Sequence, residues 1–91
     1  MARVGRNVRV FGRVQGVFFR GWTQQQAIDL GVTGWVRNCP DGSVEAHLAG
    51  EEAAVDRLLD RLRAGPPAAA VDRVEVATIA PEAGKRFEVR Y

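Results

Sequence analysis

The chain has 91 residues, with 46% hydrophobic and 26% charged side chains, a composition typical of one small globular domain and not of a disordered segment. Its formal net charge of +2 is too small to indicate nucleic-acid binding by itself. The single cysteine, Cys39, excludes an internal disulfide, and no apolar run is long enough for a signal peptide or a membrane span. We therefore expect one cytoplasmic domain over residues 1–91.

The first residues carry the patterns of a strand and then a helix. Val8 and Val10 alternate with Asn7, Arg9 and Phe11, which predicts a half-buried strand that ends near residues 12–14. Residues 20–30 contain no proline and are rich in glutamine and alanine, and Gly31 can end a helix there. Such a helix would bury one narrow stripe, formed by Thr23, Ala27 and Leu30.

The middle of the chain predicts a hairpin followed by a helix. Residues 32–37 and 44–49 alternate as strands, with turn residues at positions 40–42 between them. A helix is predicted over residues 51–63, because acidic residues begin it, Arg63 lies in its last turn and Gly65 ends it. Its apolar stripe is Val55, Leu58, Leu59 and Leu62.

After a low-complexity connector over residues 64–70, Val74 and Val76 mark a fourth strand. A short terminal strand is indicated by Phe87, Val89 and Tyr91. The order β-α-β-β-α-β with a small extra strand predicts an α+β, ferredoxin-like sandwich with two helices on one face of a mostly antiparallel sheet. Many functions occur on this fold, so the function has to be inferred from a site.

The turn before the first helix, residues 12–20, is a candidate anion site. The start of a helix presents unpaired backbone N–H groups at the positive end of the helix dipole. Gly16 would allow a close approach of the backbone, and the Arg20 guanidinium can donate two parallel hydrogen bonds to a phosphate. The simpler interpretation is a tight connection with an exposed arginine, since the nucleotide-loop motifs are absent.

Asn38 ends the second predicted strand, at the edge of the sheet where the first turn can also lie. Its carboxamide offers a donor and an acceptor, enough to orient a water against a bound phosphate. The simpler interpretation is an asparagine that starts the turn at residues 40–42.

The two segments together resemble the two signature segments of the acylphosphatase family. They read Gly12-x-Val14-Gln15-Gly16-Val17-x-Phe19-Arg20 and Gly34-Trp35-Val36-Arg37-Asn38-x-x-x-Gly42-x-Val44, followed by Gly50. The resemblance extends to the ending at residues 87–91. It implies that Arg20 is a phosphate-binding catalytic arginine and that Asn38 orients the attacking water. It also implies a phosphate cradle made by the backbone amides of Gln15, Gly16, Val17, Phe18 and Phe19.

The resemblance implies hydrolysis of the carboxyl–phosphate bond of a small acyl phosphate, giving a carboxylate and inorganic phosphate without a cofactor or a metal. The residue inventory favours the same substrate, because a site without a histidine base, a thiolate pair or a metal cluster cannot easily expel a poor leaving group. We expect inorganic phosphate to inhibit competitively, and we expect a monomer with no nucleic-acid or membrane partner.

Other chemistry-bearing residues are weaker candidates. His47 is the only histidine and is expected on the polar, exposed side of the third strand. Cys39 lies next to Asn38, but no base is evident for it as a nucleophile, so we interpret it as an incidental thiol. Asp41 and Asp72 are expected at a turn and at a strand start.

Two non-catalytic roles remain open. RNA-recognition domains share the element order, but residues 42–48 lack the aromatic, glycine-rich pattern that base stacking needs. A regulatory module that contacts a protein partner is the other alternative, as in acylphosphatase-like domains fused within larger carbamoyl-phosphate-using maturation enzymes. A chain of this length that stands alone favours an independent enzyme.

Overall fold

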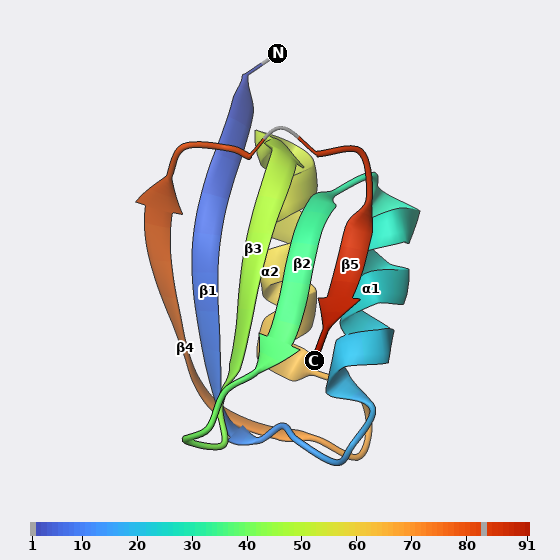
Figure 1. Cartoon of the computed structure of the whole chain (residues 1–91), viewed down its shortest axis with the longest axis vertical. Helices are drawn as coiled ribbons and strands as arrows, with labels where there is room; N and C mark the ends of the chain where they lie inside the picture. Colours follow the sequence, from blue (N-terminus) through green and yellow to red (C-terminus); the bar gives the residue numbers. More distant parts are fainter. Residues whose placement is uncertain (1, 83) are drawn as a thin grey trace.

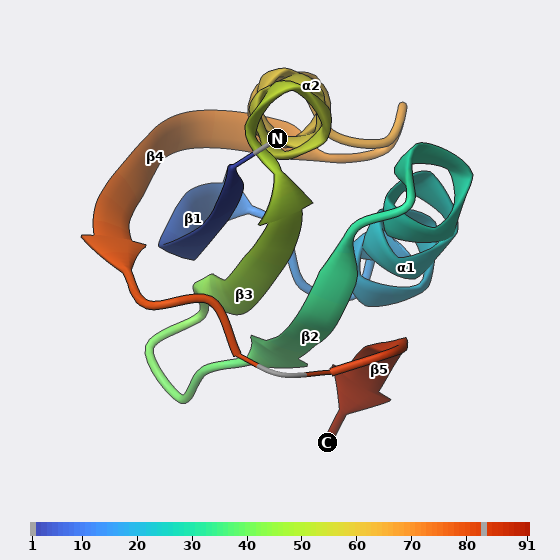
Figure 2. The same ribbon diagram turned by 90° about the horizontal axis from the view of Figure 1, so that it is seen from above.

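The computed structural model describes residues 2–82 and 84–91, which form a five-stranded sheet with two helices on one face (Figures 1 and 2). The elements follow the predicted order and confirm the ferredoxin-like α+β fold. In chain order they are β1 (Arg3–Arg13), α1 (Phe19–Leu30), β2 (Thr33–Asn38), β3 (Val44–Glu51), α2 (Glu52–Ala64), β4 (Ala70–Ile79) and β5 (Phe87–Arg90).

The strand directions bring three strand ends to one edge of the sheet. The strand order is β4-β1-β3-β2-β5. β1 and β2 both pair antiparallel with β3, so they run in the same direction, and β5 pairs parallel with β2. The carboxyl ends of β1, β2 and β5 therefore lie at the same edge, where α1 begins (Figure 1). This edge is the place to search for a site.

The core fills the space between the sheet and the two helices. In α2 the four residues of the predicted stripe are all buried, and α1 buries Thr23 and Ala27 of its own predicted stripe together with Phe19. The strands contribute alternate residues that face the helices, as the period of two requires. These are Val8, Val10, Val36, Val44, Ala46 and Leu48.

β1 is longer than the alternation of residues 7–11 predicts. It begins at Arg3 because its first residues pair with the end of β3, where Arg3 lies opposite Glu51 and Arg6 opposite Leu48. The pairing of the two strands, and not the hydrophobic pattern, therefore determines where β1 starts.

The prediction that His47 lies on an exposed face is wrong. Its residue is only 4% exposed, and its ring stacks on Trp35 with the centroids 6.0 Å apart. Its Nδ1 lies 3.7 Å from a carboxylate oxygen of Glu82, in the connection between β4 and β5. That connection passes over the face of the sheet opposite the helices (Figure 2). The alternation of residues in β3 does not predict that Glu82, far along the chain, lies next to His47.

Gly34 provides a test of the β2–β3 pairing. It has φ +139°, and a Cβ at this position would overlap the carbonyl oxygen of His47. We expect Gly34→Ala to lower the free energy of unfolding by about 3 kcal/mol or more, because backbone strain and a backbone clash add. The matched control is Gly42→Ala, at φ +92° in open space, which we expect to cost about 1–2 kcal/mol. Urea unfolding of both variants measures the difference, and equal losses would contradict this explanation.

Candidate active site

A pocket of about 400 Å³ opens at the edge where β1, β2 and β5 end. It brings Arg20 and Asn38 together, as the sequence predicts, although they are far apart in the chain. It also includes Gly16, Phe18 and Phe19 of the predicted loop. The complete lining is Val14, Gly16, Phe18, Phe19, Arg20, Gly21, Gln24, Gln25, Asn38, Val89 and Tyr91. This lining contains no carboxylate side chain, so the pocket suits an anion.

The loop between β1 and α1 presents its backbone N–H groups without protein partners. Gly16 has φ +74° and Phe18 has φ +63°, and Phe18 is the only non-glycine with positive φ among the described residues. The Phe18 carbonyl accepts the first helical hydrogen bond, from Trp22 N–H at 3.0 Å. Within the described chain, the N–H groups of residues 15–19 donate no hydrogen bond. The first turn of α1 also carries no acidic residue that could compete for them.

Arg20 is held at the end of β5. Its Nη1 donates a hydrogen bond to the Arg90 carbonyl at 3.0 Å, and its guanidinium carbon lies 4.5 Å from the centroid of the Tyr91 ring. No described side-chain carboxylate forms an ion pair with Arg20, and the other guanidinium N–H groups remain available to a ligand. The contacts with β5 therefore orient the arginine without neutralising it.

Asn38 is the last residue of β2 and lies opposite Val44, at the base of a hydrogen-bonded turn. In that turn Cys39 N–H donates to the Ser43 carbonyl at 2.8 Å. The Asp41 carboxylate accepts hydrogen bonds from the hydroxyl and the backbone N–H of Ser43, and these bonds lower the pKa of Asp41 below its usual value. These bonds hold the backbone of the turn that follows Asn38, and the half-buried Asn38 side chain lines the pocket.

The Gln15 side chain connects the two halves of the site. Its Nε2 donates to the carbonyl oxygens of Cys39 at 2.8 Å and Ser43 at 2.9 Å. Neither Gln15 nor Val17 lines the pocket, and Val17 packs against the core. If they contribute to an anion cradle, they do so through the backbone alone. The sequence gives no signal for the Gln15 contacts, because their partners are 24 and 28 residues away.

Several pocket residues were missed by sequence reasoning: Gly21, Gln24, Gln25, Val89 and Tyr91. They lie along α1 and at the end of β5, and the Gln24 Nε2 donates to the Phe87 carbonyl at 2.9 Å. This bond ties α1 to β5. Only the parallel pairing of β5 with β2 brings Val89 and Tyr91 here, and that pairing has no local signal.

The remaining candidates lie outside the pocket lining. Cys39 is buried with a free thiol, and His47 belongs to the other face of the sheet. Among residues 2–82 and 84–91, no group of three or more His, Cys, Asp and Glu residues is arranged to hold a metal ion. None of the described helices is long and apolar enough to span a membrane.

Comparison with known proteins identifies one family. The sequence model of the acylphosphatase family matches residues 6–89. An acylphosphatase from Gloeobacter violaceus is 54% identical, with 91% of this chain and 89% of the relative covered. One from Thermococcus kodakarensis is 48% identical, with 98% of each covered. The structure of an acylphosphatase from Coxiella burnetii matches with a TM-score of 0.93 at 41% identity, covering 97% of this chain and 93% of that one.

The Gln15 bridge can be tested by its effect on stability. We expect Gln15→Leu to lower the free energy of unfolding by about 1–3 kcal/mol, because two part-buried carbonyl groups each lose a donor. The matched control is Gln25→Leu, an exposed position on α1, which should change stability by less than about 0.5 kcal/mol. Chemical unfolding measures both, and indistinguishable values would show that the bridge contributes nothing.

Proposed function

Because the chain belongs to the acylphosphatase family, we propose that the pocket at the start of α1 is its active site. The activity is that of an acylphosphate phosphohydrolase, which converts an acyl phosphate to a carboxylate and inorganic phosphate. One observation supports the placement: unpaired backbone amides, a guanidinium without a carboxylate partner and an asparagine all meet in one pocket. The roles of the individual residues follow from their chemistry.

The phosphoryl group is bound by the loop and by Arg20. Its oxygens replace the missing acceptors of the N–H groups of residues 15–19, at the positive end of the α1 dipole. Arg20, in the first turn of α1, adds charge-assisted hydrogen bonds to the same phosphoryl group. These donors also stabilise the charge that the phosphoryl oxygens carry in the transition state, and they are already in place before the reaction.

Asn38 positions the nucleophile. Its carboxamide oxygen can accept a hydrogen bond from a water while its NH₂ group donates to that water or to the phosphoryl group. A water held in line with the scissile bond has already lost its translational and rotational freedom before the attack, so this entropy loss does not add to the barrier of the chemical step. The hydrogen bonds of the β2–β3 turn and the Gln15 bridge hold the backbone of Asn38 next to the loop that binds the phosphoryl group.

The leaving group departs without protonation by the enzyme. The water oxygen forms a bond with phosphorus, and the bond from phosphorus to the acyl oxygen breaks with its electron pair on the carboxylate. The water proton passes to a phosphoryl oxygen of the substrate. Arg20 cannot act as the acid, since a guanidinium does not deprotonate in proteins, and the pocket lining offers no carboxyl or imidazole side chain. A carboxylate, with a pKa near ~4, tolerates this arrangement.

The finer properties of the enzyme follow from the same site. Inorganic phosphate carries the group that the loop binds, so it inhibits competitively. One chain supplies all the lining residues, so the proposed site needs no residue from a second copy. The free thiol of Cys39 fits a reducing cytoplasm.

The decisive experiment compares leaving groups. We expect kcat/KM to be high for acyl phosphates such as benzoyl phosphate, low for aryl phosphates and undetectable for glycerol phosphate, because no group protonates the departing oxygen. Excess EDTA should leave the acyl phosphate rate unchanged. Comparable turnover of alkyl and acyl phosphates would reveal a general acid, and loss of activity with EDTA would reveal a metal; either result contradicts the mechanism.

Substitutions at Arg20 and Asn38 should separate binding from water orientation. Arg20→Lys should weaken inhibition by phosphate and lower kcat, because an ammonium cannot reproduce the planar pair of donors. Asn38→Ala should lower kcat about 100-fold while the phosphate inhibition constant stays within about twofold. The matched control for the arginine is Arg57→Lys, at an exposed position on α2, which should be neutral. If Asn38→Ala instead abolished phosphate binding with kcat unchanged, its assignment would be wrong.

A further inference from the structure

The pocket is larger than a phosphoryl group requires. Its volume of about 400 Å³ corresponds to roughly a dozen liquid waters at about 30 Å³ each, whereas a phosphoryl group has only a few heavy atoms. The lining continues from the loop along α1 through Gly21 and Gln24 and reaches Val89 and Tyr91 at the end of β5. A second part of the ligand can therefore occupy the groove between α1 and β5.

Phe18 forms an unusual wall of this groove. Phe18 is a large apolar residue, yet it is 68% exposed. Its backbone has φ +63°, a conformation that is energetically unfavourable for a bulky residue. The presence of phenylalanine at position 18 is therefore explained neither by burial in the core nor by the backbone conformation.

The missing side chain of Gly21 leaves the space that the Phe18 ring occupies. A Cβ at Gly21 would lie 2.5 Å from Cε1 and 2.6 Å from Cζ of that ring, closer than real Cβ contacts allow. The ring therefore rests against the first turn of α1, at the end of the loop whose N–H groups we propose bind the phosphoryl group. Any side chain larger than hydrogen at Gly21 would displace the ring or the loop.

Tyr91 provides a second aromatic surface on the same pocket. It is fully exposed, and its ring lies over the Arg20 guanidinium. Val89 adds an apolar contact to the lining. In an in-line displacement the leaving group lies opposite the attacking water, so it lies away from the water held by Asn38. The apolar part of the groove is then available to the acyl group.

We propose that Phe18, held against Gly21, is a specificity-determining residue for the acyl group, and that the groove prefers acyl phosphates with an aromatic acyl group. This inference rests on the proposed function of the same pocket. An aromatic ring contributes burial and ring–ring contact with Phe18 that an acetyl group cannot provide. Gly21 acts as the positioning residue for this contact.

The test is the ratio of kcat/KM for benzoyl phosphate to that for acetyl phosphate. Phe18→Asn removes the ring at a position where asparagine tolerates positive φ, and Phe18→Tyr keeps the ring. We expect Phe18→Asn to reduce the ratio about 5- to 10-fold, because kcat/KM falls further for benzoyl phosphate than for acetyl phosphate. Phe18→Tyr should retain the ratio, and Gly21→Ala should reduce it. The matched control is Ile28→Asn, an apolar residue on the same helix that is 66% exposed and does not line this pocket.

Three outcomes would overturn the inference. An unchanged ratio in a folded Phe18→Asn variant would show that the ring does not contact the acyl group. An equal loss for both substrates with weaker phosphate inhibition would show that Phe18 only shapes the amide loop. If wild type hydrolysed neither acyl phosphate, the proposed function would fail and this inference with it, whereas wild-type turnover with an unchanged ratio removes this inference alone. Circular dichroism and thermal unfolding establish that each variant is folded.

Discussion

The common direction of β1, β2 and β5 is the constraint on which the rest of the site depends. Two antiparallel pairings with β3 set the directions of β1 and β2, and one parallel pairing adds β5. As a result, the loop that starts α1, the asparagine that ends β2 and the carbonyl that orients Arg20 meet at a single edge. The Gln15 bridge then fixes the loop relative to the β2–β3 turn.

The site combines features that folding alone would not favour. The loop leaves backbone N–H groups without protein partners, Phe18 has positive φ, and two aromatic side chains are exposed at the pocket. Each of these is unfavourable in isolation, and each has a use in the proposed site, which would bind an anion with an apolar substituent. The continuous core under the sheet supplies the stability that tolerates them.

The sequence predicts most of the fold because α2 and the central strands carry clear periodicity, and the four buried residues of α2 are those of its apolar stripe. Arg20 and Asn38 could be chosen because two separate segments resemble one family, although neither residue is distinctive by itself. The burial of His47 and the roles of Gln15 and Tyr91 were not predictable. All three depend on contacts across the chain, made by the β4–β5 connection, the β2–β3 turn and β5.

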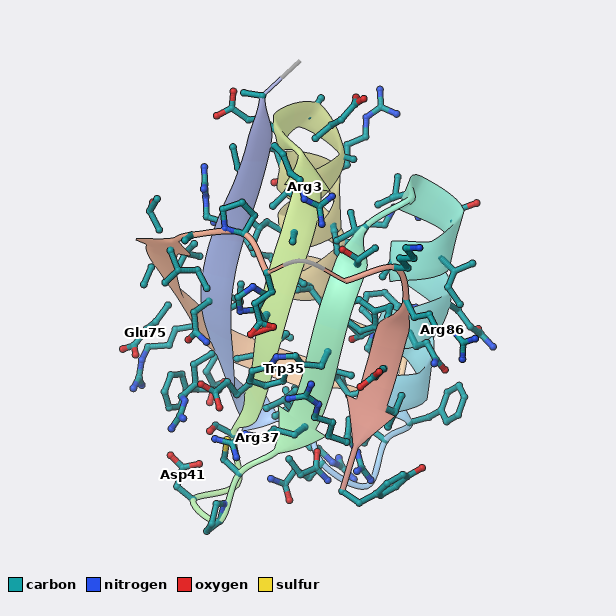
Figure 3. All side chains as sticks on the ribbon, turned by 45° about the horizontal axis from the view of Figure 1, so that its top comes forward. Arg3, Trp35, Arg37, Asp41, Glu75 and Arg86 are labelled. Carbon is teal, nitrogen blue, oxygen red and sulfur yellow. The ribbon has the colours of Figure 1, made fainter. Side chains whose placement is uncertain are left out.

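The charge distribution explains why a chain with a net charge of only +2 can have an electropositive site. On the face of the sheet away from the helices, Arg9 and Arg37 both contact Glu45. Burial raises the pKa of Glu45, but hydrogen bonds from Arg37 and Asn7 lower it by more, so the carboxylate remains charged and neutralises its neighbours. Arg73 and Arg90 also have glutamate partners (Figure 3 shows this face). Carboxylates therefore offset part of the arginine charge on this face. Arg20, held by a carbonyl and an aromatic ring instead, keeps its charge for the anion that enters the pocket.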